Sequence, residues 1–514
     1  MEIQIPISFP TCLFFSFIFL LMEIYVIISN SSSSKLPPGP WKLPIVGNIH
    51  QLMIGSSLLL HQTLRDLAKK HGPLMYLKFG NVPTIVISST EYAKQVMRVH
   101  DVNFSSRPSI LFSKVMLYDG AGLAFAPYNE HWRQLRRIFM QELLSTTRIQ
   151  CFKSIREEEM SNFIESISSN VGDVINISER LNMLMYNIIS RAACGRTRIR
   201  NKEFLSVLTE VTEVSLGFEL ADLFPSLKLF YQMSRSRPKL ERLRERATTI
   251  FEEIIHEHKD QKPKDRSHED LVDVLLKFHN NDDHLGFSLT NENIYAIIFE
   301  IFAAGIETTA TSTEWAMSEL MKNPKIMKKA QDEVREVFHR NGLGNERALD
   351  EMKYLKSVIN ESMRLHPSLP LLVPRQNQEK CEINGYEIPA KTNTIINAWV
   401  IGRDPKYWPE PEIFKPERFL DNNNSIDSKL GNKFEFLPFG GGRRICVGMS
   451  FGFLNVELCL ALLLYHFDWM LPNGMKHEDL DMSETFAATL QRKNFLQVIP
   501  IAYELSKTTA NKLE

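Results

Sequence analysis

The sequence lacks an excess of charge of either sign. Its 514 residues hold 60 lysines and arginines against 61 aspartates and glutamates, so the formal net charge is −1 at pH 7. Proteins that bind nucleic acid through their overall field are strongly basic. The balance therefore gives no reason to expect a nucleic-acid partner, and a charged partner has to be recognised by a local patch.

Cysteine is also scarce, and no two cysteines are spaced as Cys-x-x-Cys. The six that occur are widely scattered: Cys12, Cys151, Cys194, Cys381, Cys446 and Cys459. This pattern excludes a zinc site of that type and a disulfide scaffold, and it predicts a reducing compartment for the bulk of the chain. With 44% hydrophobic residues and no internal repeat, the chain has the composition of a globular protein with a substantial core.

Charged residues are absent from residues 3–22, where Phe, Ile and Leu dominate. As a helix, about 20 residues span ~30 Å of hydrocarbon. A cleaved signal peptide is the alternative, but Glu2 stands where a positive charge is usual, and no convincing cleavage site follows. The first basic residues, Lys35 and Lys42, come after the run, so the positive-inside rule leaves the C-terminal bulk cytosolic. We therefore predict a single-pass membrane anchor helix over residues 1–30.

The segment after this run is a linker. Serines at 31–34 give it flexibility, and three prolines between positions 37 and 40 stiffen it toward a polyproline II rod. We predict a hinge over residues 31–45, which would hold a domain of residues 46–514 at a fixed angle to the membrane.

The remainder of the chain is mainly helical, with two small β regions. Residues 74–88 have the pattern of a hairpin with Gly80-Asn81 at its turn, and 382–399 predict a second β region. Helical signals dominate from about 130 to 365. Within them, residues 258–290 are rich in Lys, Asp, His and Asn, and we expect an exposed connection there.

One helix is long enough to cross the whole domain. Thr290 is its predicted cap and Asn323-Pro324 its end, and its apolar first half predicts a buried, central position. In its middle, Gly305 costs roughly 1 kcal/mol of helix propensity, and Glu307 carries charge into the core. Such local inconsistency is typical of functional sites. A helix kink or packing against a partner is the alternative.

Several other polar groups are commonplace when taken singly. Trp132 and Arg136 are i, i+4 neighbours, a spacing that is often surface cation–π packing. Glu361 and Arg364 are i, i+3 neighbours, as on many solvated helices, and Arg418 follows in a Pro-Glu-Arg-Phe sequence.

A glycine-rich loop at 438–448, Pro-Phe-Gly-Gly-Gly-Arg-Arg-Ile-Cys-Val-Gly, is the most informative stretch. Its three glycines allow positive φ and close approach to a bulky group. Arg443 and Arg444 predict a cationic neighbourhood that favours the thiolate of Cys446. A lone cysteine in such a loop, before an apolar helix, suggests an axial metal ligand. A surface turn with a buried structural cysteine is the alternative.

The loop fits Phe-x-x-Gly-x-Arg-x-Cys-x-Gly, which resembles the haem-binding signature of the cytochrome P-450 family. The other motifs also resemble that family's, and they occur in family order: Trp-x-x-x-Arg, the oxygen-groove sequence Ala-Gly-x-Glu-Thr-Thr, Glu-x-x-Arg and Pro-Glu-Arg-Phe. Glu307 stands where Asp is commoner. The resemblance covers nearly the whole chain and implies the cytochrome P-450 fold, mainly α with a small β-rich portion, preceded by one N-terminal transmembrane helix.

The resemblance also implies a role for each matching residue. Cys446 would be the axial ligand of the iron of haem b, and Thr308 with Glu307 would relay protons to oxygen. The implied cofactor-binding residues are Cys446, Trp132, Arg136, Arg375, Arg444, Phe439 and Gly442. The implied structural network behind the haem consists of Glu361, Arg364 and Arg418.

The implied reaction inserts one atom of O2 into a C–H or C=C bond. Its electrons would come from NADPH through NADPH–cytochrome P-450 reductase, at the endoplasmic reticulum membrane with the catalytic domain in the cytosol. Details such as Gly402-Arg403-Asp404-Pro405 look most like plant A-type microsomal members, and among these like subfamilies that oxidise terpenoids and alkaloids.

The same analogy implies a hydrophobic plant metabolite as substrate. The expected substrate contacts lie near four largely apolar stretches: Ser109 to Leu123, Phe299 to Ala304, Leu369 to Val373, and Phe486 to Ala488. A terpenoid fits this lining, and an alkaloid, such as a monoterpene indole alkaloid, is the alternative. A haem-thiolate isomerase or dehydratase and a non-catalytic haem carrier are further alternatives, against which Thr308 argues.

Overall fold

The computed structural model describes residues 17–18, 21, 35–54, 59–195, 201–212, 219–260, 269–280, 288–420, 433–486 and 489–503. The predicted anchor helix therefore lies outside the described residues except at three positions. Within the described part, two helices are long and apolar enough to cross a membrane: α15 (Asn291–Lys322) and α19 (Met449–His466). In each of them, more than half of the most apolar stretch of 18 residues is buried inside the protein, so both are core helices.

The helices and strands follow one another with helices dominating the middle of the chain. The remaining helices are α2 (Ile49–Ile54), α3 (Leu60–His71), α4 (Thr90–Lys94), α5 (Leu111–Met116), α6 (Glu130–Ile138), α7 (Thr146–Cys151), α8 (Lys153–Ser168), α9 (Ile177–Cys194), α10 (Asn201–Thr212), α11 (Leu220–Leu223), α12 (Lys228–Met233), α13 (Ser236–Asp260), α14 (Leu271–Asn280), α16 (Pro324–Asn341), α17 (Lys353–Leu365) and α18 (Ala398–Ile401). The strands are β1 (Leu74–Phe79), β2 (Val82–Ile87), β3 (Ile175–Asn176), β4 (Arg375–Gln376), β5 (Cys381–Ile383), β6 (Tyr386–Ile388), β7 (Asn393–Ile396), β8 (Phe467–Met470), β9 (Glu484–Phe486), β10 (Leu490–Arg492) and β11 (Gln497–Ala502).

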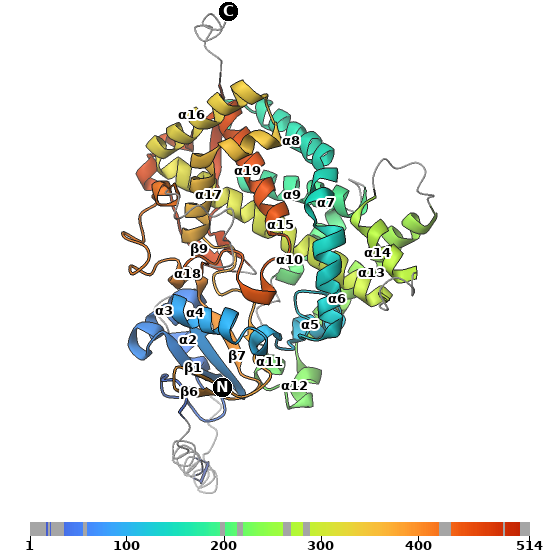
Figure 1. Ribbon diagram of the computed structural model, residues 1–514, viewed down its shortest axis with the longest axis vertical. Coiled ribbons are helices and arrows are strands. Elements are labelled where there is room, and N and C mark those ends of the chain that lie inside the picture. The colour runs from blue at the N-terminus through green and yellow to red at the C-terminus, as the bar shows by residue number, and fades with distance from the viewer. Residues whose placement is uncertain are drawn as a thin grey trace, which may run out of the picture.

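The strands near the N-terminus form a small β-rich part beside a large helical body (Figure 1). Its sheet has the order β1-β2-β7-β4, in which β2 and β7 are parallel and the other neighbours antiparallel. Leu74 pairs with Ile87 and Phe79 with Val82, so the predicted hairpin is confirmed. Gly80 takes a φ of +59° at its turn. The predicted β region at 382–399 is confirmed as β5, β6 and β7, although its last residues begin α18.

Helix α15 passes through the middle of the helical body, as predicted (Figure 1). The Thr290 hydroxyl accepts a hydrogen bond from the Asn293 backbone N–H at 3.2 Å, and the helix ends at Lys322 before Asn323. It packs against α9, α17 and α19. Most of its residues are buried, Trp315 completely.

The predicted exposed connection over 258–290 is partly wrong. α13 continues to Asp260, and α14 occupies much of the remaining described part. Val272 and Leu275 of α14 are fully buried in the main core. The prediction failed because the segments on both sides of α14 are polar, so the average composition of 258–290 did not indicate a short apolar helix within it.

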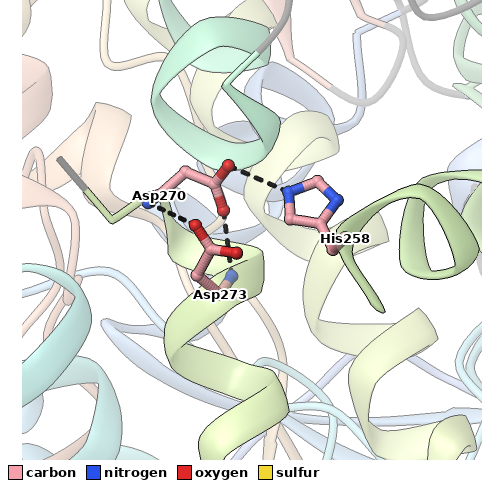
Figure 2. A group of neighbouring side chains, drawn as sticks. All are labelled: His258, Asp270 and Asp273. Atoms are coloured by element: carbon pink, nitrogen blue, oxygen red, sulfur yellow. Dashed lines mark hydrogen bonds and ion pairs between the residues drawn. The ribbon is translucent and has the colours of Figure 1, made fainter. Parts of the chain in front are cut away.

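The junction of α13 and α14 is held by three polar side chains (Figure 2). His258 Nε2 lies 2.9 Å from Asp270 Oδ2, which joins the two helices. The side chains of Asp270 and Asp273 accept each other's backbone N–H at 2.9 and 3.3 Å. This reciprocal pair satisfies donors that the start of a helix leaves without partners. The cluster is thus explained as a helix cap.

Candidate functional site

A cavity of ≈ 320 Å³ lies between the middle of α15 and the glycine-rich loop. Ala304 and Thr308 of α15 line it on one side, and Phe439 and Cys446 line it on the other. Apolar residues dominate the lining, with a few polar groups among them. This composition is typical of a site for a hydrophobic ligand.

Glycine lets the loop pass close to its neighbours. Gly442 has a φ of +66°, and a Cβ there would lie 2.3 Å from the Met97 carbonyl oxygen, so a side chain is excluded. The Cys446 N–H donates to the Phe439 carbonyl at 3.0 Å and closes the loop. The side chain of Cys446 is exposed toward the cavity.

The environment of Cys446 differs from the predicted one. Desolvation raises the pKa of its thiol and outweighs the lowering by the Gly448 backbone N–H and by Arg136. The predicted help from Arg443 and Arg444 is wrong, because Arg443 pairs with Asp101 at 3.0 Å and Arg444 donates to backbone carbonyls. A metal ion bound to the sulfur would reverse the shift, since a coordinating thiol loses its proton.

Four arginines converge on the cavity: Arg107, Arg136, Arg375 and Arg444. Burial lowers the pKa of Arg375 to about 10. Burial, followed by repulsion from Arg375 and Arg136, lowers the pKa of Arg444 to about 9. Buried cations in mutual repulsion are costly unless an anion joins them. The cavity therefore suits a ligand that carries carboxylates, as haem b does, next to a metal held by Cys446.

Trp132 lies among these arginines. The guanidinium carbons of Arg444 and Arg136 lie 4.3 and 5.7 Å from its ring centroid, within the range of cation–π attraction. Its indole N–H donates to the Leu123 carbonyl at 3.2 Å, which fixes the ring against the cavity wall. The predicted Trp-x-x-x-Arg pair is thus brought to the cavity.

The two predicted proton-relay residues point in different directions. Thr308 lines the cavity, and its hydroxyl donates to the Ala304 carbonyl at 2.6 Å. Glu307 is not among the cavity-lining residues. Its carboxylate instead accepts from the Thr489 hydroxyl at 2.6 Å and the Gln491 amide at 2.5 Å, and burial raises its pKa. Residues one apart on a helix are rotated by about 100°, so Glu307 cannot share the face of Thr308.

Glu300 is the acidic residue among those that line the cavity; it lies in the predicted stretch Phe299 to Ala304, but the sequence analysis gave it no role of its own. Its carboxylate accepts from the backbone N–H groups of Leu123 and Ala124 at 2.6 and 3.0 Å. Gly122 makes room for it, because a Cβ there would lie 2.5 Å from the carboxyl group. Arg107 donates to the Ala124 carbonyl at 3.0 Å from the other side of this loop. The sequence contained one signal for this position: Glu300 precedes Ala304 of the groove sequence by four residues, which places both on one face of the helix.

The pKa of Glu300 predicts a pH effect on stability. Burial raises this pKa from 4.5 to about 7, so between these values the folded protein holds a proton that the unfolded chain has lost. Stability then falls as pH rises. We expect the free energy of unfolding of the wild type, relative to Glu300→Gln, to fall by up to about 3 kcal/mol between about pH 5 and pH 8. Urea unfolding at several pH values measures it.

The matched control for this prediction is Glu142→Gln, since Glu142 is an exposed glutamate outside the cavity lining. Its stability difference from the wild type should stay constant with pH. Hydrogen exchange adds a local readout, because Glu300→Gln places an amide NH2 opposite one of two N–H donors. We expect faster exchange of the backbone N–H groups of Leu123 and Ala124. Unchanged exchange, together with a stability difference that does not vary with pH, would contradict the role of Glu300 in holding these two groups.

The predicted network behind the loop has formed. Glu361 and Arg364 are both fully buried and joined by hydrogen bonds of 2.7 and 2.8 Å. Arg418 Nε donates to Glu361 Oε1 at 2.9 Å. Arg364 also donates to the carbonyls of Gly402 and Pro411, both at 2.7 Å.

Three of the four predicted substrate stretches reach the cavity. They do so through Leu123, through Glu300, Ile301 and Ala304, and through Leu369, Leu372 and Val373. Phe299 is buried but does not line the cavity. Positions 487 and 488 of the fourth stretch lie outside the described residues.

The chain is similar to known proteins along most of its length. The sequence profile of the family described as cytochrome P-450 matches residues 37–498. Cytochrome P-450 71D11 of Lotus japonicus is 50% identical over 93% of this chain and 97% of its own. Tabersonine 6,7-epoxidase isoform 1 of Catharanthus roseus is 47% identical over 96% and 98%, and premnaspirodiene oxygenase of Hyoscyamus muticus 45% over 96% and 98%. A solved zebra fish cytochrome P-450 with progesterone superposes with a TM-score of 0.75 at 24% identity, covering 87% of this chain and 100% of its own.

Proposed function

The chain belongs to the cytochrome P-450 family of haem b monooxygenases, and from this premise we propose that it hydroxylates or epoxidises a hydrophobic plant specialised metabolite of the terpenoid class. The observation that carries the proposal is the cavity itself, in which Cys446, a ring of arginines and an apolar wall face one space. Two relatives at 45–47% identity are named for oxygenating premnaspirodiene and for epoxidising tabersonine. An alkaloid substrate is the alternative.

We assign the cofactor-binding roles to residues that reach the cavity. Cys446 would hold the iron through its sulfur, and the Gly448 N–H would tune that sulfur. Arg136, Arg375 and Arg444 would neutralise the carboxylates of the cofactor, and Trp132 and Phe439 would shape its pocket. The predicted Gly442 does not line the cavity, and it acts on the loop through its close approach to Met97 and Asp101. Bound haem with a thiolate ligand supplies the activation of O2 and the oxidation of the substrate.

The remaining residues orient the substrate and control protons. The apolar wall formed by Ala304, Leu369 and Val373 holds a hydrophobic skeleton and excludes water. We assign proton delivery into the cavity to the Thr308 hydroxyl. Glu307 does not line the cavity, and its carboxyl group, whose pKa is raised by burial, is bonded to Thr489 and Gln491. We therefore assign the proton role to Thr308 alone.

Electrons come from NADPH through NADPH–cytochrome P-450 reductase in this proposal. A membrane anchor at residues 1–30 would hold both proteins on the endoplasmic reticulum, with residues 31–45 as hinge and 46–514 as the cytosolic catalytic domain. The near-zero net charge implies that the reductase is recognised by a local patch.

The test is to incubate the full-length protein with reductase and NADPH against a panel of terpenoids and alkaloids, with products identified by mass spectrometry. A product that has gained one oxygen atom and requires NADPH supports the proposal. A rearranged or dehydrated product formed without NADPH would instead identify an isomerase or dehydratase. Absence of any product together with a normal CO-difference band would favour a haem carrier.

Replacement of Thr308 by alanine is expected to uncouple electron use from oxidation. The variant keeps the cavity but lacks the hydroxyl that we assign to proton delivery, and general acid–base groups typically contribute 10²–10⁴-fold. We expect product per NADPH consumed to fall by roughly 10²-fold, with hydrogen peroxide taking up the electrons. Thr308→Ser keeps the hydroxyl and should remain coupled. Fully coupled turnover by Thr308→Ala rules out the role.

A further inference from the structure

A buried histidine outside the predicted site lies between two carboxylates. His366 follows α17, and its Nε2 lies 2.8 Å from Glu319 Oε1 of α15. Its Nδ1 lies 3.2 Å from Glu484 Oε1 of β9. The side chains of all three residues are only 8% exposed. One ring therefore bridges elements from three distant parts of the sequence.

The geometry favours the protonated form of this ring. Ionised carboxylates only accept hydrogen bonds, so a ring with one at each nitrogen donates from both nitrogens as an imidazolium. Burial alone would lower the pKa of His366, but the hydrogen bonds to Glu319 and Glu484 outweigh it and raise the pKa. Burial by itself would raise the pKa of Glu484, but the hydrogen bond to His366 and further favourable interactions outweigh burial and lower this pKa. The positive charge of His366 and the negative charge of Glu484 therefore stabilise each other.

The neighbouring groups hold the ring in one orientation. Trp315 of α15 stacks on it with centroids 3.9 Å apart and planes within 3°. His61 Nε2 of α3 lies 3.3 Å from the second oxygen of Glu484. Arg403 acts on Glu484 and Arg492 on Glu319 through their charges. The titratable and charged groups that face the cluster from α3, the segment after α18 and β10 are thus His61, Arg403 and Arg492.

The segment that begins at this ring forms a wall of the cavity. Residues 367–373 follow directly, and Ser368, Leu369, Leu372 and Val373 line the cavity. The Ser368 hydroxyl lies 2.9 Å from the Ser312 hydroxyl and 3.2 Å from the Thr308 carbonyl oxygen. The Ser368 carbonyl accepts the Leu490 N–H at 2.9 Å. A shift of the ring would therefore be transmitted to the residues that face Thr308.

We propose that His366 is a positively charged positioning residue that locks the 367–373 wall to α15 and β9 and so sets the shape of the substrate pocket. This inference rests on the proposed function only in taking the cavity as the substrate site. The pKa of His366 is raised in the folded protein. The stabilising hydrogen bonds from the protonated ring are therefore fully present below the pKa of free imidazole, and they are lost as pH rises through the pKa of His366 in the folded protein.

The test uses the holoenzyme with a phenyl-substituted imidazole as pocket probe, and so needs no known substrate. His366→Gln cannot carry a charge, and we expect the probe's spectral Kd to rise by roughly tenfold at neutral pH, the scale of a lost charged hydrogen bond. The wild-type Kd should rise with alkaline pH, and that of His366→Gln should not follow this rise. The CO-difference band reports haem ligation separately, so failure of the monooxygenase proposal does not affect the result.

Two further variants keep the proposal falsifiable if His366→Gln does not fold. Glu484→Gln removes one of the two carboxylates, so the alkaline rise in Kd should begin at a lower pH than in the wild type. His339→Gln replaces an exposed histidine of α16 and should match the wild type throughout. An unchanged Kd in His366→Gln, or an alkaline transition that Glu484→Gln does not move, overturns the proposal.

Discussion

Replacement of Cys446 by alanine is expected to abolish the CO-difference band of the reduced protein and all monooxygenase activity. Cys446 is the cysteine that lines the cavity, and we assign it as the axial ligand because a thiolate is what gives this class its spectrum and its oxygen chemistry. The loss should be complete, since the other sulfur among the lining residues is the thioether of Met363, which cannot supply a thiolate. Difference spectroscopy of membranes that contain the variant measures the result.

The control for this experiment is Cys151→Ala, because Cys151 is half-buried at the end of α7 and does not line the cavity. It should keep the band and the activity. Cys446→Ser adds a variant of nearly unchanged size, so loss of the band there cannot be attributed to a hole in the loop. A normal band in either Cys446 variant would refute the ligand assignment.

Local signals made the main helices and the loop predictable. Thr290 and Asn323-Pro324 bounded α15 correctly, because capping and the restriction before proline act over a few residues. The glycine-rich loop was predictable for the same reason, since Gly442 occupies a conformation and a space that exclude other residues.

Side-chain direction was less predictable than element type. Glu307 was grouped with Thr308 by sequence, yet its carboxylate bonds to Thr489 and Gln491 from a strand about 180 residues later in the chain. Arg443 likewise turns to Asp101 and not to the thiol. These outcomes depend on which distant segments pack against each face, and spacing along the chain does not contain that information.

Buried charges outside the motifs were missed for a related reason. His366 has no local pattern and Glu300 only its spacing to Ala304, while charge in a core is tolerated only when partners from other elements satisfy it. For Glu300 these partners are the N–H groups of Leu123 and Ala124. For His366 they are Glu319 and Glu484. Each becomes visible as a site only when the fold brings these segments together.

Replacement of Glu361 by glutamine is expected to cause the largest loss of stability among the variants considered. Glu361 Oε1 accepts from Arg364, Arg418 and the Lys415 N–H, at 2.8, 2.9 and 2.9 Å. Glutamine would turn an NH2 group toward guanidinium donors and leave the fully buried Arg364 without this anion. Removing one partner of a buried ion pair typically costs about 3–5 kcal/mol, a large share of a typical free energy of unfolding of about 5–15 kcal/mol.

The expected result is a protein that accumulates poorly and does not retain haem, measured by haem content per polypeptide and by the thermal midpoint. The exposed pair Glu130 and Arg133 on α6 has the same i, i+3 spacing with side chains 64% and 54% exposed, and it provides the control. Glu130→Gln should show no measurable loss, because solvent already screens that pair. The contrast separates burial from pairing: if both variants behave alike, the network contributes little, and haem retention must depend on the cavity residues alone.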